Sequence, residues 1–166
     1  MTLAPVGLLI LMAAFGLAVA TLHDIGFRTI PDWLSATLAA DGIALRLLDH
    51  HLPAGVVCGV AVFILAAFCW RRGWLGGGDV KLLGATAILI PPTLVPGFVL
   101  AVSLAGGVLA LLYLLLERIV PAPRLRHSAS FLRRVLIVEC RRIRRRTSLP
   151  YATAISAAAL LMLAKG

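Results

Sequence analysis

The stretch GGGDVKLLGATAILIPP, residues 76–92, opens with three glycines and an acid, continues as an apolar run and ends in two prolines. Proline removes a backbone donor and restricts the residue before it, so the run predicts a short helix from Asp79 to Ile90. At about 1.5 Å per residue this helix is about 18 Å long, less than the ~30 Å hydrocarbon core of a bilayer. We therefore expect other helices to surround it.

The composition is that of a membrane protein. Hydrophobic residues make up 61% and charged residues 14% of the 166 positions, and the mean hydropathy is +1.00. A soluble domain needs more polar surface. The first 24 residues lack the basic segment of a secretory signal, so we expect them to remain as a transmembrane helix. The three cysteines form no C-x-x-C pair, which indicates neither a zinc site nor a disulfide framework.

Apolar segments separated by polar or glycine- and proline-containing turns predict six transmembrane helices. They would form an all-α, polytopic membrane helical bundle that is a single domain over residues 1–166. The expected spans are Leu3–Leu22, Trp33–Leu48, Ala54–Trp70, Asp79–Ile90, Val95–Leu116 and Tyr151–Leu163.

Basic residues are concentrated in the connections after the first, third and fifth spans. Ten of the 16 lysines and arginines lie between residues 117 and 148. Short cytoplasmic loops hold the excess of basic residues, which predicts that both termini are non-cytoplasmic. The segment 117–149 is then a basic cytoplasmic loop or an interfacial helix on anionic lipid headgroups. No aromatic platform is interleaved with its charges, so we expect no nucleic-acid binding.

Two acidic residues are expected at the ends of helices on the predicted cytoplasmic side of the membrane. Asp24 follows the first apolar span and Asp79 begins the fourth. An ionisable residue at the edge of a span is costly and is a functional candidate by default, although Asp79 could also serve only as a helix cap. Two carboxyl groups within hydrogen-bond range share one proton, so one can take a proton from water while the other protonates a peptide carbonyl. The motifs of serine and zinc hydrolases, G-x-S-x-G and H-E-x-x-H, do not occur.

The conformational freedom of glycine offers an explanation for the three glycines before Asp79. Gly76, Gly77 and Gly78 lack Cβ atoms, so we expect them to adopt positive φ and to let a substrate strand approach Asp79. They are not a phosphate-binding loop, because no Lys-Ser or Lys-Thr follows at the required spacing.

Three motifs occur together in order along nearly the whole chain. The combination resembles the prepilin peptidases, and specifically their short CpaA/TadV type that serves tight-adherence (Flp) pili. The residues that carry the resemblance are Asp24, Arg28, Ile30, Pro31, Asp32 and Trp33, then Gly76, Gly78, Asp79 and Lys81, then Pro150 and Tyr151.

The resemblance implies an intramembrane aspartic endopeptidase with Asp24 and Asp79 as catalytic residues and no cofactor or metal. Its substrate would be a type IV (Flp-type) prepilin or pseudopilin, whose basic leader is removed at the cytoplasmic face of the bacterial inner membrane. The pilus or secretion assembly machinery is a further expected partner. Methyltransferase activity is not expected, because the four-cysteine domain of the long family members has no counterpart. The residues expected to bind substrate or support the site are Gly76, Gly77, Gly78, Lys81, Arg28, Pro31 and Tyr151.

The chain departs from the family pattern at two positions. Asp32 stands where the family has asparagine, and it could cap the second helix or add negative potential that attracts a basic leader. Ala152 replaces a glycine that often follows the Pro-Tyr pair. A third acid, Asp41, falls inside the second span, where it could break the helix beside Gly42, pair with Arg46 or lie in a water-filled cavity.

Two other classes of protein fit parts of the sequence. A small proton- or cation-coupled transporter would use the intramembrane acids as a relay, and would show repeated, broken helices. A non-catalytic subunit of a pilus or secretion platform would tolerate asparagine at both Asp24 and Asp79.

Overall fold

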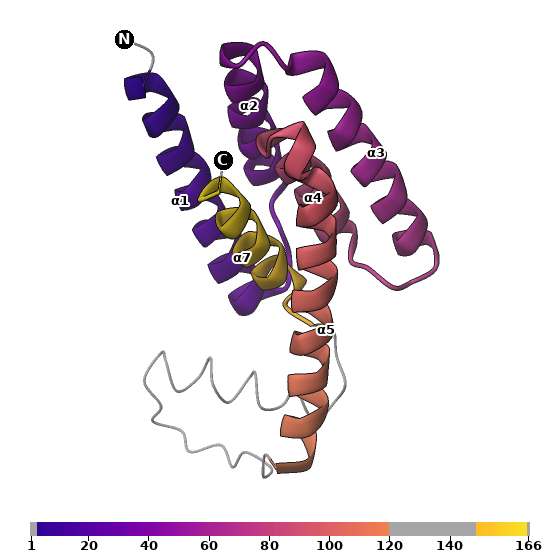
Figure 1. Cartoon of the computed structure of the whole chain (residues 1–166). Helices are drawn as coiled ribbons and strands as arrows, with labels where there is room; N and C mark the ends of the chain where they lie inside the picture. Colours follow the sequence, from indigo (N-terminus) through magenta and orange to yellow (C-terminus); the bar gives the residue numbers. More distant parts are fainter. Residues whose placement is uncertain (1–2, 120–148, 166) are drawn as a thin grey trace.

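The structure is a computed structural model, and it describes residues 3–119 and 149–165. Within these ranges the regular structure is entirely helical, as Figure 1 shows, and the predicted all-α bundle is confirmed. The elements are α1 (Leu3–Phe27), α2 (Asp32–Leu48), α3 (Leu52–Arg71), α4 (Gly77–Leu89), the 3₁₀ helix η1 (Pro92–Leu94), α5 (Val95–Ile119) and α7 (Tyr151–Leu163).

Each predicted span coincides with one of these helices to within a few residues. Three helices, over Pro5–Phe27, Leu52–Arg71 and Pro92–Leu116, are long and apolar enough to cross a membrane. That all six cross it, and that both termini are non-cytoplasmic, stay predictions. The basic loop or interfacial helix predicted at 117–149 lies, apart from its ends, outside the described residues.

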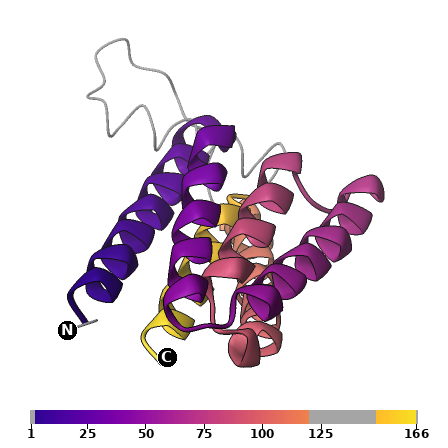
Figure 2. The same ribbon diagram turned by 90° about the horizontal axis from the view of Figure 1, so that it is seen from above.

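The short helix α4 is the centre of the bundle, and Figure 2 shows neighbouring helices on several sides of it. It packs mainly against α2 and α3, with a smaller contact to α7. Eight of its 13 residues are buried, so the expectation that other helices surround it is confirmed. It begins at Gly77, which makes Asp79 its third residue and not its first.

Glycines on facing helices allow α4 to pack this closely. A Cβ atom added at Gly42 of α2 would lie 2.7 Å from the backbone nitrogen of Leu89. One added at Gly84 of α4 would lie 2.9 Å from Cβ of Phe63 in α3, and one added at Gly59 of α3 would lie closer still to the side chain of Ile88 in α4. Small residues at such contacts let helix backbones approach, which is how membrane helices gain packing contacts in lipid.

Helix α7 packs between α1 and α5, and Figure 1 shows it beside α1 with its first residues toward the end of the bundle where α1 ends. The hydroxyl of Ser156 donates a hydrogen bond of 3.0 Å to the carbonyl of Leu17 in α1. Because few polar groups compete for partners in an apolar interior, this bond fixes the register of the two helices.

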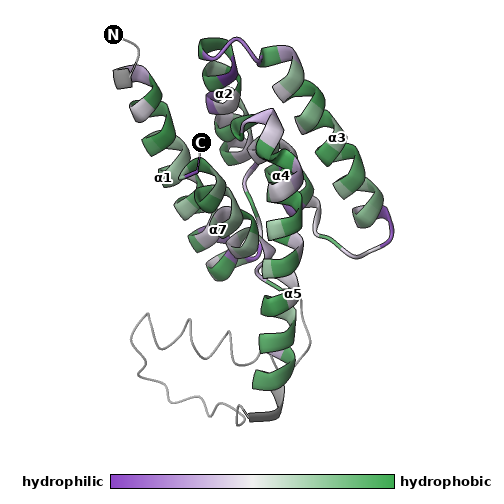
Figure 3. Ribbon diagram, viewed as in Figure 1, coloured by the Kyte–Doolittle hydropathy of each residue, from purple (hydrophilic) through white to green (hydrophobic). Residues whose placement is uncertain are grey.

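The outer surface of the bundle is apolar, as Figure 3 shows by the green colour along α1, α3 and α5. Large side chains such as Leu11, Phe15, Val57 and Val108 are two-thirds exposed or more. A soluble monomer rarely exposes apolar surface on this scale. The chain is a membrane protein, and these side chains are the ones that lipid would contact.

At the other end of α4 lies a buried charge. Arg46 of α2 is only 5% exposed, and it forms an ion pair of 2.5 Å with Asp49. It also donates a hydrogen bond of 3.4 Å to the carbonyl of Leu89. This carbonyl is one of those that the end of α4 leaves without a helical partner. Asp41 therefore does not pair with Arg46. Nor does it break the helix beside Gly42, since α2 is continuous from Asp32 to Leu48.

Candidate active site

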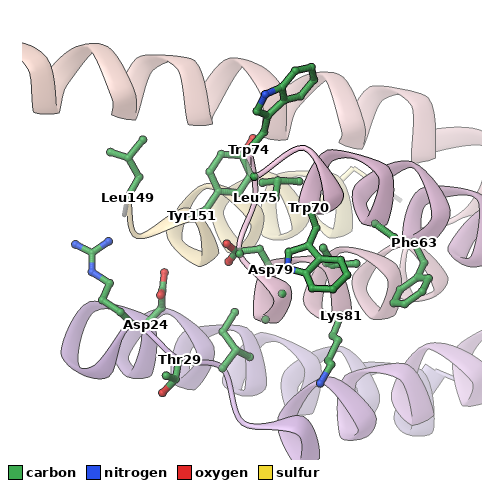
Figure 4. A pocket seen from close by; sticks show the side chains of 18 of the residues that line it. Asp24, Thr29, Phe63, Trp70, Trp74, Leu75, Asp79, Lys81, Leu149 and Tyr151 are labelled. Atoms are coloured by element: carbon green, nitrogen blue, oxygen red, sulfur yellow. The ribbon is translucent and has the colours of Figure 1, made fainter. Parts of the chain in front are cut away.

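A cavity of about 1100 Å³ opens where α1 and α3 end and where α2, α4 and α7 begin. Small-molecule sites typically have about 300–1,000 Å³, so this cavity has room for a segment of peptide. All of the site residues predicted from the sequence line it, except Pro31. Figure 4 shows the cavity from close by.

The sequence predicted that Asp24 follows the first helix. It lies instead in the last turn of α1, because α1 continues to Phe27. It is only 5% exposed. Its carboxylate accepts a hydrogen bond of 3.2 Å from the backbone N–H of Ala152, in the first turn of α7. The N-terminus of a helix carries free N–H groups and a partial positive charge, so it binds a carboxylate well. The start of α7 thus holds Asp24 in place.

Asp79 is half-buried in the first turn of α4. Its carboxylate turns back and accepts a hydrogen bond from the backbone N–H of Gly76, as an acidic third residue does in a capping box. It also interacts electrostatically with Asp24 and with Arg28. In Figure 4 the carboxylates of Asp24 and Asp79 point toward the same space. Two acids far apart in the sequence therefore meet at one cavity.

The expected positive φ of the glycines is wrong. Gly76 is extended, with φ −76° and ψ 147°, and Gly77 and Gly78 belong to the helix α4. Glycine is needed at two of these positions because there is little space for a side chain. A Cβ at Gly76 would lie 2.9 Å from Oδ2 of Asp79, and one at Gly78 would lie 3.2 Å from Cβ of Ile30. The glycines let the carboxylate and the connection between α1 and α2 approach the backbone.

Arg28 ends α1 in an unusual conformation. Its φ is +56°, in the left-handed region that costs a residue other than glycine about 1–3 kcal/mol and that clusters at functional sites. Its guanidinium donates a hydrogen bond of 3.5 Å to the hydroxyl of Tyr113 in α5. Arg28 therefore connects the end of α1 to α5 while its charge acts on Asp79.

Lys81 has a different partner from the one its position suggests. It lies two residues after Asp79, but its Nζ pairs with Oδ1 of Asp32 at 2.7 Å. Asp32 does not cap α2, because the cap position is occupied by Pro31 and Asp32 is the first helical residue. The capping interpretation of Asp32 is thus wrong, and the pair joins the start of α2 to α4.

Tyr151, the first residue of α7, lies beside the two acids in Figure 4 and interacts electrostatically with Asp79. Its ring covers Gly106 of α5, where an added Cβ would lie 2.7 Å from the tyrosine hydroxyl. Pro31 does not reach the cavity; it acts indirectly, by starting α2.

Sequence reasoning missed several apolar residues of the cavity wall. The most exposed are Trp70, at 54%, and Trp74, at 69%. A signal was available, since the segment WRRGW directly precedes the glycines and tryptophan is enriched where membrane meets water. The other apolar ones are Phe63, Ala67, Gly73, Leu75, Val80 and Leu149, and the polar Thr29 was missed as well.

Fold and cavity together define an all-helical membrane protein in which two carboxylates from different helices face one cavity at one end of the bundle. The sequence matches the type IV leader peptidase family over residues 10–111, and the chain belongs to this family. The match includes both Asp24 and Asp79.

One relative is a preflagellin peptidase of Methanococcus maripaludis strain C6, which is 26% identical over 92 residues. The alignment covers 52% of this chain and 40% of the archaeal protein, so the chain matches less than half the length of that relative. No solved structure matches the chain.

Proposed function

We propose that this protein is an intramembrane aspartic endopeptidase that removes the basic leader from type IV prepilins of the Flp type, or from pseudopilins. The observation that carries the proposal is the meeting of Asp24 and Asp79 at one cavity, each held by a backbone N–H at the start of a helix. Membership of the leader peptidase family supports it.

The chemistry follows from a pair of carboxyl groups that share one proton. The ionised member takes a proton from a water molecule, whose oxygen attacks the carbonyl carbon of the scissile peptide bond. The protonated member gives its proton to the carbonyl oxygen, which leaves a tetrahedral diol. When the diol collapses, the carboxyl that took a proton from water gives it to the leaving nitrogen as the C–N bond breaks. The other carboxylate takes a proton from a diol hydroxyl, so the pair again holds one proton.

Gly76 gives the substrate access to this pair. It is exposed at the cavity and has no side chain of its own, so an extended peptide can approach its backbone beside Asp79. A helical peptide bond is shielded by its own backbone, so the substrate would unwind there. Its apolar helix would lie against the bundle in the membrane, with the basic leader in water.

The setting we propose is the bacterial inner membrane, with six spans, both termini outside and the cavity at the cytoplasmic face. The exposed Trp70 and Trp74 support a position at the boundary between membrane and water. The basic segment 117–149 would lie against anionic headgroups on the same side. Leader removal would not be followed by methylation, and pilus or secretion assembly proteins would receive the product.

The proposal is tested by co-expressing the chain with a candidate prepilin and following leader removal on a gel. Wild-type protein should cleave, whereas Asp24→Asn and Asp79→Asn should leave the precursor intact, because neither variant can share a proton between two carboxyl groups. Asp41→Asn is the matched control: it also removes an acid from a span, but Asp41 does not line the cavity.

Cleavage that persists in either active-site variant would overturn the catalytic pair. Normal pilus assembly by both variants would instead favour a non-catalytic assembly subunit.

A further inference from the structure

At the cavity wall, one ion pair is exposed and joins two elements that both border the catalytic space. Oδ1 of Asp32 and Nζ of Lys81 are 2.7 Å apart, and their side chains are 79% and 49% exposed. Both residues line the cavity that holds Asp24 and Asp79. A substrate that enters the cavity therefore meets this pair close to the cleavage site.

The pair is weak enough to open. An ion pair between exposed side chains contributes little to stability, because water screens it and two side chains must be held still. The lysine has a long, flexible stem, whereas the short side chain of Asp32 keeps its carboxylate close to the first turn of α2. A cation from outside can thus replace Lys81 at little cost, with the carboxylate already in position.

The surroundings favour a cation over an anion as the incoming group. Asp32 is the more exposed partner, and the first turn of α2 stabilises its negative charge through the free N–H groups and the helix dipole. The exposed rings of Trp70 and Trp74 belong to the same cavity wall, and aromatic faces attract cations.

We propose that Asp32 determines specificity by binding a lysine or arginine side chain of the substrate on the cytoplasmic side of the cleaved bond, in place of Lys81. The inference rests on the proposed peptidase function and adds the residue that recognises the positive charge of the leader. Lys81 holds the site closed to weaker ligands until a competing cation arrives.

The experiment compares two versions of one prepilin, with lysine or glutamine at the basic position of the leader that lies nearest the cleavage site. The purified full-length protein in lipid vesicles is assayed for kcat/KM on both. Wild type should prefer the lysine version by at most about fivefold, because the ion pair with the substrate forms at the expense of the pair with Lys81. Asp32→Asn should reduce the preference to about onefold.

Two further variants separate binding from a loss of structure. Lys81→Gln should lower KM for the lysine version, because Asp32 loses its internal competitor. Asp32→Lys should reverse the preference toward a leader with glutamate at the same position. Asp41→Asn, on the same helix but away from the cavity, should keep the wild-type ratio.

The inference is overturned if Asp32→Asn keeps the wild-type preference, or if Lys81→Gln weakens binding of the lysine version. A preference for a glutamate leader that is lost in Lys81→Gln would also overturn it, since Lys81 would then be the recognising group. If wild type cleaves neither prepilin, the peptidase function itself fails, which is a different result from equal cleavage of both.

Discussion

Replacing Gly76 by alanine should damage catalysis without harming the fold. The backbone of Gly76 is extended, at φ −76° and ψ 147°, a conformation that alanine adopts freely, so the folded state is not strained. Loss of glycine freedom in the unfolded chain contributes about 0.4–1 kcal/mol to stability and offsets part of what the disturbed hydrogen bond of Asp79 costs. The only obstacle is local, because the new Cβ would lie 2.9 Å from Oδ2 of Asp79.

An ordinary contact begins at 3.4 Å, so the carboxylate of Asp79 must move by at least 0.5 Å (3.4 − 2.9). The movement disturbs its hydrogen bond from the N–H of Gly76. Hydrogen bonds to charged groups contribute about 1.5–3 kcal/mol, and losing this stabilisation in the transition state corresponds to a loss of about 10- to 150-fold in kcat. KM should stay within about twofold, because the residues that contact the rest of the substrate are unchanged.

The neighbouring glycine is the matched control. A Cβ at Gly77 would lie 3.5 Å from Nε1 of Trp70, an ordinary contact, so Gly77→Ala should keep near-wild-type kcat. The assay is the initial rate of leader removal by purified protein in vesicles, with the denaturation midpoint measured alongside. Wild-type kcat in Gly76→Ala, or an equal loss in Gly77→Ala, would refute the steric reasoning.

Two further pairs of glycines make similar predictions. Gly42→Ala places a Cβ 2.7 Å from backbone of α4 and should lower the free energy of unfolding by about 1–3 kcal/mol through overpacking, whereas Gly7→Ala, which has open space around it, should not. A detergent-denaturation titration measures both, and equal midpoints would contradict the packing. In Gly106→Ala the new Cβ pushes against the ring of Tyr151, so leader removal should slow several-fold. Gly107→Ala is the control, because its Cβ has open space around it. An equal effect of the two substitutions would count against a role for the ring.

The helices could be predicted closely, because long apolar runs with glycine and proline at their ends determine helix bounds by local chemistry. That Asp24 and Asp79 lie at the same end of the bundle could also be predicted from the sequence. Successive spans cross the membrane in opposite directions, so the end of the first helix and the start of the fourth come to the same side of the membrane. The short apolar run of α4 was enough to predict that other helices surround it.

Contacts between side chains far apart in the sequence could not be predicted. Lys81 lies two residues from an acid, yet it pairs with Asp32 because the start of α2 packs beside α4. Spacing along the chain does not report such packing. For the same reason the sequence could not show that Arg46 reaches the carbonyl of Leu89 at the end of α4.

The glycines show the limit of conformational arguments from sequence. Positive φ is one reason for a glycine and close approach is another, and three in a row are compatible with both. Only the position of the Asp79 carboxylate beside Gly76 decides between them. Ala152 was missed in the same way, because its contribution is a backbone N–H that any residue except proline would offer to Asp24.

The central claim is that Asp24 and Asp79 act as one catalytic unit, and single-turnover rates of leader removal test it most directly. Wild type, Asp24→Asn, Asp79→Asn and the double variant should be compared in vesicles with enzyme in excess over prepilin. Residues that act as a unit are not additive, so each single variant should lose at least about a thousandfold and the double variant should be no slower than the singles. Substantial cleavage by either single variant, or losses that multiply in the double variant, would contradict the claim.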